Sequence, residues 1–264
     1  MSYPNKLNEN NITSLDKRHH VRSMFNSIYR TYDLLNHLLS LGVDIYWRKK
    51  SLSNVNLDQN SVCLDLAAGT GDYGLEVHKK FKSFVIGYDI AENSLLLFKK
   101  KIKNKKLDKK RFLLINGEAE NISLKDSSVD LVTIAFGIRN FYDSQKAVHE
   151  IFRILKVNGT LLILEFGLPK NPIIRKLYKL YFEKILPLIG RMISKSEFAY
   201  KYLPESVRLF EQQKDIISEI IVAGFRDIKV KPMTFGIVNL YEAKKVSEEY
   251  YYNDDKNLFR KLLT

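Results

Sequence analysis

The sequence has one cysteine, no long apolar run and fewer acidic than basic residues. The first two shortages argue against an internal disulfide and a membrane-spanning helix. Because Cys63 stands alone, no disulfide can form within the chain, which suits a reducing compartment. No uninterrupted apolar stretch approaches the ~18 residues that a membrane-spanning helix needs. Residues 1–16, which we expect to be a disordered lead-in, contain no apolar segment of the kind found in signal peptides. We therefore expect a cytoplasmic protein.

The shortage of acidic residues leaves a net charge of +13, from 43 Lys and Arg against 30 Asp and Glu. Such a surplus attracts either nucleic acid phosphates or anionic lipid headgroups. The densest basic run, 99–111, contains no aromatic residue on which a base could stack. We interpret it as a solvated helix end and expect no nucleic-acid partner. The histidines are scattered without ligand spacing, so we also expect no metal site.

One stretch combines a strand, a glycine loop and the start of a helix. Val62, Cys63, Leu64 and Leu66 form a short apolar run, which is typical of a buried parallel strand. Residues 67–71 then form a loop almost without side chains, so a ligand can approach the backbone closely. From Asp72 the pattern fits the first turns of a helix, whose free N–H groups would point at that ligand.

A second apolar strand, 84–88, ends at Asp89, which lies 20 positions after Gly69 (89 − 69). An acidic residue about 20 positions beyond the loop is where Rossmann-like units bind ribose hydroxyls. Gly69, Gly71 and Gly74 also satisfy G-x-G-x-x-G spacing, which suits a dinucleotide as well as other adenosine ligands. These residues predict an adenosine-type ligand and leave its identity open.

Strand and helix patterns alternate along much of the chain. Further strands are expected at 112–115, 129–135 and 160–166, with helices at 91–103 and 145–155. The alternation predicts a mainly parallel sheet with helices on both faces. Ligands of such sheets bind at the carboxyl ends of the strands, where a set of candidate residues falls: Gly69, Asp89, Glu118, Ala135 and Glu165.

Two helical segments flank this alternation. We expect 17–55 to be a helical lid over the site and 172–210 to be a helical insertion. A helix at 212–223 and two strands near 228–230 and 237–243 follow, joined by a turn at Phe235-Gly236. The predicted fold is a Rossmann-like α/β sheet of seven mostly parallel strands with a terminal antiparallel hairpin. We predict one domain over 17–245 and a tail over 246–264 without an assigned role.

Five parallel strands followed by an antiparallel hairpin resembles the plan of class I S-adenosylmethionine-dependent methyltransferases. Longer segments resemble the ubiquinone/menaquinone biosynthesis C-methyltransferase family: VRSMFNSIYRTYDLLNHLLSLGVDIYWRK (21–49), LDLAAGTGD (64–72), TIAFGIRNF (133–141), LLILEFGLP (161–169) and YKYLPESVRLF (200–210). Two positions depart from the family pattern. Val157-Asn158-Gly159 replaces Pro-Gly-Gly, a turn that Asn158 can still make, and Tyr241 stands near where the family has a histidine.

The resemblance implies S-adenosylmethionine as the cofactor and assigns residues to it. Gly69 and Thr70 in the loop and Asp89 on the ribose would contact the cofactor. Glu118 and Ala119 would flank the adenine, and Ala135 would face the methionine end.

The resemblance also implies the reaction, which is transfer of a methyl group to a ring carbon of a polyprenylated hydroquinone in menaquinone or ubiquinone biosynthesis. Arg139 and Asn140 would be the catalytic residues, with Arg139 stabilising a phenolate or orienting a water. The alternative for Arg139 is a salt bridge to a surface acid such as Asp143. Tyr32 and Asn36 on the lid would meet the substrate.

Two other function classes stay open, an RNA methyltransferase that uses the basic surface and a non-catalytic nucleotide-binding module or NAD enzyme. A prenylated substrate further implies visits to a membrane surface, at the inner face of the membrane. Basic residues around the apolar segment 177–193 would support that contact: Lys176, Lys179, Lys184, Arg191 and Lys195.

Overall fold

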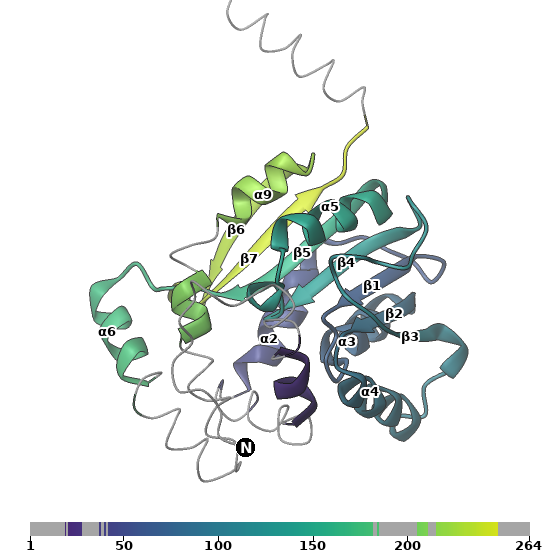
Figure 1. Ribbon diagram of the computed structural model, residues 1–264, viewed down its shortest axis with the longest axis horizontal. Helices are drawn as coiled ribbons and strands as arrows, with labels where there is room; N and C mark the ends of the chain where they lie inside the picture. Colours follow the sequence, from purple (N-terminus) through teal and green to yellow (C-terminus); the bar gives the residue numbers. More distant parts are fainter. Residues whose placement is uncertain are drawn as a thin grey trace, which may run out of the picture.

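A seven-stranded sheet runs through the centre of the structure (Figure 1). This is a computed structural model, in which residues 19, 21–27, 37, 40, 42–181, 184, 205–210 and 215–247 are described. The strands are β1 (Val62–Leu66), β2 (Phe84–Asp89), β3 (Phe112–Asn116), β4 (Val129–Ala135), β5 (Leu155–Phe166), β6 (Arg226–Met233) and β7 (Val238–Lys244). Their order across the sheet is β3-β2-β1-β4-β5-β7-β6.

Strands β1 to β5 run parallel to one another, whereas β7 lies between β5 and β6 and is antiparallel to both. The predicted parallel sheet with a terminal antiparallel hairpin is therefore confirmed. The strand order reverses between β1 and β4, and in open α/β sheets that point is where ligands bind.

Helices cover both faces of the sheet (Figure 1). Those used here are α2 (Val43–Ser51), α3 (Asp72–Phe81), α4 (Glu92–Asn104), α5 (Ser144–Ile154), α6 (Pro172–Leu180) and α9 (Ile216–Val222). One apolar core contains Ile151 of α5 and Ile220 of α9. A second core contains Trp47 of α2, Val77 of α3 and Phe98 of α4. Helices α2, α3 and α4 therefore form one layer on the sheet, and residues of this layer also line the pocket described below.

Side-chain caps set the beginnings of the later helices. The Asp143 side chain accepts a hydrogen bond from the N–H of Lys146 at 2.9 Å, so α5 begins at Ser144, one residue before the predicted start. Asp215 caps α9 in the same way through the N–H of Ser218. The predicted helix 212–223 includes residues outside the described part.

The start of β5 differs from its prediction as a strand over 160–166. The strand begins at Leu155, and its pairing with β4 shifts register between Val129 and Leu131. Within the shifted segment Asn158 has φ 67°, a left-handed conformation that asparagine tolerates. Its N–H donates to the carbonyl of Lys245 at 2.7 Å. The turn expected of Asn158 is therefore present, as a bulge inside the strand.

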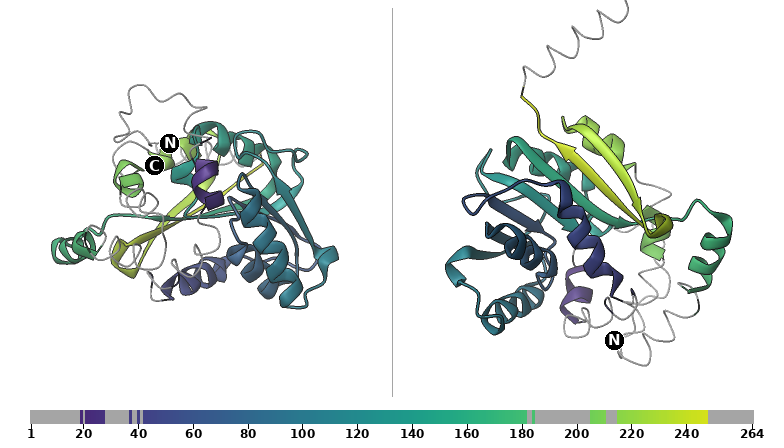
Figure 2. Two further views of the ribbon diagram at one scale, coloured as in Figure 1. Left: turned by 60° about the horizontal axis from the view of Figure 1, so that its bottom comes forward. Right: turned by 180° about the vertical axis from the view of Figure 1, so that it is seen from behind.

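The flanking segments are described in part. Residues 21–27 and α2 are helical, and within the predicted insertion both α6 and residues 205–210 are helical. Figure 2 shows α6 at the margin of the molecule, at the end opposite α4. Among the described residues, none of the helices combines the length and the apolar character that spanning a bilayer requires.

Candidate active site

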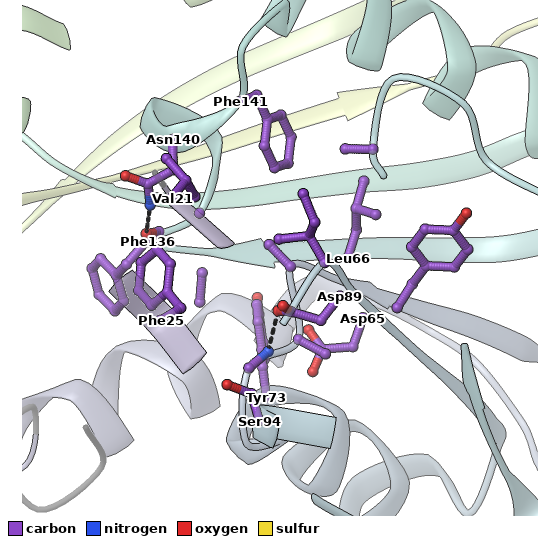
Figure 3. Close-up of a pocket in the computed structure, with 18 of the residues that line it drawn as sticks. Val21, Phe25, Asp65, Leu66, Tyr73, Asp89, Ser94, Phe136, Asn140 and Phe141 are labelled. Carbon is purple, nitrogen blue, oxygen red and sulfur yellow. Dashed lines mark hydrogen bonds between the residues drawn. The ribbon is translucent and has the colours of Figure 1, made fainter. Parts of the chain in front are cut away.

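A pocket opens at the carboxyl ends of β1 to β4 and is shown in Figure 3. Four loops line it, namely 67–70 after β1, 89–90 after β2, 117–120 after β3 and 135–137 after β4. The N-terminal helices contribute Val21, Phe25 and Arg48. The pocket therefore gathers strand ends and the described part of the predicted lid.

The loop after β1 requires glycine. Gly69 and Gly71 have φ values of 54° and 84°, a region that other residues rarely adopt. A Cβ at Gly71 would also lie 2.2 Å from the ring of Phe98 on α4. The loop leads directly into the N-terminus of α3, whose first N–H groups have no carbonyl partner within the helix; that of Gly74 donates to Asp65 instead.

Asp89 lies at the end of β2 and faces this loop. Its Oδ2 accepts from the N–H of Gly69 at 2.7 Å, and its Oδ1 accepts from the N–H of Ala91 at 2.7 Å. Burial raises the pKa of Asp89, and these two hydrogen bonds oppose the rise. Each carboxylate oxygen has a second lone pair, so Asp89 can still accept from two neighbouring hydroxyls. That donor–acceptor set fits a ribose.

Thr70 also lines the pocket, and its Oγ1 accepts from Nζ of Lys101 on α4 at 2.8 Å. The same ammonium pairs with Asp72, the first residue of α3, at 2.5 Å. The glycine loop is therefore tied to α3 and α4 by a shared cation.

Asp65 forms the floor of the pocket, and the sequence analysis missed it. Burial raises its pKa to about 7, although hydrogen bonds from the N–H of Gly74 and the hydroxyl of Thr133 lower it. A signal was available, because Asp65 is an acidic residue inside an otherwise apolar strand. Buried carboxylates with raised pKa values cluster at functional sites.

The loop after β3 forms the opposite end of the pocket. Glu118 and Ala119, the predicted neighbours of an adenine, line it together with Glu120. The carboxylate of Glu120 accepts from the N–H groups of Tyr142 at 2.9 Å and Asp143 at 3.2 Å. Burial raises the pKa of Glu120. Glu120 therefore holds the loop after β4 against the loop after β3.

An aromatic wall stands at the end of β4. Phe136 follows Ala135 with a left-handed φ of 59°, and both residues line the pocket. The Phe136 ring stacks on the ring of Phe166, with 4.5 Å between the ring centres. It meets the Trp47 ring edge-on, with 5.9 Å between the centres. Figure 3 shows Phe25 on the same side of the close-up as Phe136. A strained, non-glycine residue held in this way is characteristic of functional sites.

Asn140 and Arg139 lie in a 3-10 turn, η4 (Ile138–Asn140). Asn140 lines the pocket, and its Nδ2 donates to the carbonyl of Phe136 at 3.4 Å (Figure 3). Arg139 lies behind the pocket wall and is absent from the residues that line it. Its Nη1 donates to Glu165 at 2.7 Å and to the carbonyl of Phe136 at 2.5 Å.

The ion pair of Arg139 corrects one expectation. The alternative to a catalytic role was a salt bridge to Asp143, but Arg139 pairs with the fully buried Glu165, and Asp143 caps α5. The catalytic role itself stays a prediction. Tyr32 and Asn36, the predicted substrate-binding residues, lie outside the described residues. In the described part of the chain, no group of three or more His, Cys, Asp and Glu side chains is placed to hold a metal ion.

The strand order, with the glycine loop after β1 and the acidic residue at the end of β2, defines the class I S-adenosylmethionine-dependent methyltransferase fold. A SAM-dependent methyltransferase from Thermotoga maritima, described as a possible histamine N-methyltransferase, has the same fold. It aligns with a TM-score of 0.61 and 19% identity over 86% of this chain and 100% of that one. The [4+2]-cyclase SpnF aligns with a TM-score of 0.61 and 13% identity over 86% of this chain and 95% of that one. The fold therefore leaves the reaction open.

The sequence narrows the class to one family. The chain belongs to the ubiE/COQ5 methyltransferase family, whose model matches residues 12–245. A demethylmenaquinone methyltransferase from Chlorobaculum parvum is 40% identical over 86% of this chain and 93% of the relative. The ubiquinone/menaquinone biosynthesis C-methyltransferase UbiE from Geobacter sulfurreducens is 37% identical over 87% of this chain and 90% of the relative.

Proposed function

We propose that this enzyme methylates a ring carbon of a polyprenylated hydroquinone in the biosynthesis of menaquinone, ubiquinone or both. The observation that carries the proposal is identity of 34–40% to demethylmenaquinone methyltransferases over most of the chain. The pocket supports it, because an aromatic wall adjoins an adenosine-type site. Membership of the family does not favour an RNA methyltransferase or a non-catalytic module.

Residues along the pocket suit a bound S-adenosylmethionine, which supplies an electrophilic methyl group. We assign Asp89 to the ribose hydroxyls, because both of its oxygens keep a free lone pair. Gly69, Thr70 and Ala135 line the same space. Glu118 and Ala119 complete the set at the far end.

The aromatic wall is our candidate for the position of the quinol ring. Phe25 and Phe136 line this part of the pocket, so a ring lying against them would be shielded from water (Figure 3). Proton loss from the phenol makes the neighbouring ring carbon nucleophilic. Asn140 is placed to orient the phenol oxygen, and Tyr32 and Asn36 remain candidates for the ring's other contacts. Arg139 would act from behind the wall.

An activity assay with the purified protein tests which ring, naphthoquinol or benzoquinol, is methylated. With S-adenosylmethionine and short-chain prenylated substrates, we expect turnover of a reduced naphthoquinol, a reduced benzoquinol or both, measured by chromatography and mass spectrometry as gain of one methyl group. Oxidised quinones serve as the control, because their ring carbons are not electron-rich. Absence of a methylated product from both reduced substrates would contradict the proposal.

We further propose that α6 carries the enzyme to the membrane surface that holds such a substrate. Ile173, Leu177 and Leu180 recur at helical spacing, and the first two are 71% and 61% exposed. Lys176 and Lys179 are exposed on the same helix. An apolar stripe beside lysines is complementary to an anionic bilayer.

A hairpin tip beside α6 extends this surface. Phe235 in η6 (Thr234–Gly236) is 77% exposed, and the following Ile237 accepts at its carbonyl a hydrogen bond from the N–H of Gly167, before α6. Aromatic side chains favour the interface between water and lipid.

Liposome co-sedimentation tests the docking surface. We expect binding to vesicles that contain anionic lipid, weakening between low and moderate salt. The I173Q/L177Q variant should lose most of it, whereas the matched I221Q/V222Q variant, which changes exposed apolar residues on α9, should bind as the original does. A protein that stays in the supernatant at low salt would contradict docking and leave the methylation proposal intact.

A further inference from the structure

Arg48 on α2 is a buried cation with an unused donor at the pocket. The residue is 7% exposed and lines the pocket, and its Nε has no hydrogen-bond partner among the described residues. A buried N–H without an acceptor destabilises a folded protein. Such a group is retained where a ligand supplies the acceptor.

The guanidinium is held in place by contacts that leave Nε free for a ligand. Nη1 of Arg48 donates to Oδ2 of Asp44 at 2.5 Å, one helical turn earlier. The Cζ atom of Arg48 lies 5.7 Å from the centre of the Phe136 ring, within cation–π range. Arg48 is thus fixed between the aromatic wall and the body of α2.

The Asp44 carboxylate has further partners of its own. Oδ1 accepts from Ser40 at 2.7 Å, and Oδ2 contacts Nδ1 of His37 at 2.8 Å. Burial would raise the pKa of Asp44, but the hydrogen bonds from Ser40 and His37 and the charge of Arg48 hold it below its ordinary value. Because Asp44 stays ionised and well paired, Arg48 is oriented before any ligand arrives.

The charge of Arg48 stands out within the pocket. Among the described lining residues it is the one cationic side chain, facing five acids: Asp65, Asp72, Asp89, Glu118 and Glu120. The acidic side chains disfavour a ligand carboxylate, and among the charged lining residues Arg48 is the one that attracts it. The amino-acid part of S-adenosylmethionine carries such a carboxylate, and guanidinium groups bind carboxylates with strong, charge-assisted hydrogen bonds.

We propose that Arg48 binds the carboxylate of the amino-acid part of S-adenosylmethionine through its Nε–H. The proposal rests on the assignment of this pocket to the cofactor and adds to it the lid helix α2. Cofactor binding would then connect α2 to the strand ends and fix Phe136, on which Arg48 lies, beside the substrate.

Two ligands that differ in the amino-acid part test the proposal by isothermal titration calorimetry. S-adenosylhomocysteine carries the carboxylate, and 5′-methylthioadenosine lacks it. We expect R48M to bind S-adenosylhomocysteine about ten- to a hundred-fold more weakly, as loss of one charge-assisted hydrogen bond implies, and to bind 5′-methylthioadenosine as the original does. R48K should recover part of the loss because it keeps the charge.

Controls separate the possible failures. K49M removes an exposed charge from the same helix and should change neither affinity. If R48M weakens both ligands equally, D44N/R48M removes the carboxylate that would be left unpaired, and equal weakening there too would overturn the proposal. Unchanged S-adenosylhomocysteine affinity with a raised KM for the quinol would also overturn it, since Arg48 would then meet the substrate phenolate. An original protein that binds neither ligand would instead contradict the cofactor site itself.

Discussion

Single side chains determine how tightly the pocket binds its ligand, and Asp89 is the clearest case. Asp89→Ala should weaken S-adenosylmethionine binding by about 1–3 kcal/mol, because the acceptor of the ribose hydroxyls is lost. Isothermal titration measures the change, and Asp126→Ala is a matched control at an exposed acid. Equal affinities of the original and Asp89→Ala would remove Asp89 from the site.

Asp65 should make the stability of the ligand-free protein depend on pH. Its pKa is raised from 3.8 to about 7 in the folded state, so the stability that the protonated form contributes is complete below about 3.8 and is lost as pH rises toward 7. Asp65→Asn cannot ionise, so its melting temperature should rise relative to the original between pH 5 and pH 8, by at least about 2 °C. A difference that stays constant across this range would contradict the raised pKa.

Spacing predicted some of these residues and missed others for a physical reason. Asp89 and Gly69 were found because a loop and an acid 20 positions apart (89 − 69) constrain each other within the sequence. Arg48 and Asp65 were missed because their burial depends on elements far away in the chain. The Asp44–Arg48 pair at i, i+4 was a visible signal, but only the fold shows that it faces a pocket.

At the scale of elements, the ends of β4 and β5 are joined by the Arg139–Glu165 ion pair. Both side chains are buried, so Arg139→Met should destabilise the protein by about 3–5 kcal/mol by leaving Glu165 unpaired. R139M/E165M should restore much of that stability, measured by urea denaturation. Equal stability of the original and Arg139→Met would contradict a structural role.

The same pair of variants tests the predicted catalytic role of Arg139. If Arg139 stabilises the reacting phenolate, R139M/E165M should fold and bind S-adenosylmethionine yet turn over more slowly, with kcat lowered. Normal kcat in the refolded double variant would leave Arg139 with a purely structural role.

Element boundaries were predicted well where local signals exist. The strand 129–135 was predicted with its observed bounds, because five of its seven residues are apolar and Asp130 and Thr133 interrupt them only singly. The bulge at the start of β5 was not placed inside the strand, since its hydrogen bonds come from Lys245, almost 90 residues later (245 − 158 = 87). Such long-range partners carry no local pattern.

At the scale of the whole molecule, the mostly parallel sheet follows from the alternation of strands and helices, and its antiparallel end follows from the closing hairpin. The positions of the two proposed functional surfaces were harder to predict: the cofactor loops lie at the carboxyl ends of β1 to β4, whereas the proposed lipid-facing helix α6 stands at the margin of the molecule (Figure 2). The single domain over 17–245 and the substrate contacts of Tyr32 and Asn36 stay predictions, because part of the lid lies outside the described residues.

We propose that this pocket directs the methyl group to a ring carbon of a prenylated quinol rather than to one of its oxygens. The most direct measurement supplies S-adenosylmethionine labelled with ¹³C at the methyl group and records the NMR spectrum of the extracted product. We expect a methyl signal at the chemical shift of a carbon-bound aromatic methyl, strongly reduced when Asp89→Ala replaces the original protein. A signal at the shift of a methoxy group, or no labelled product, would contradict it.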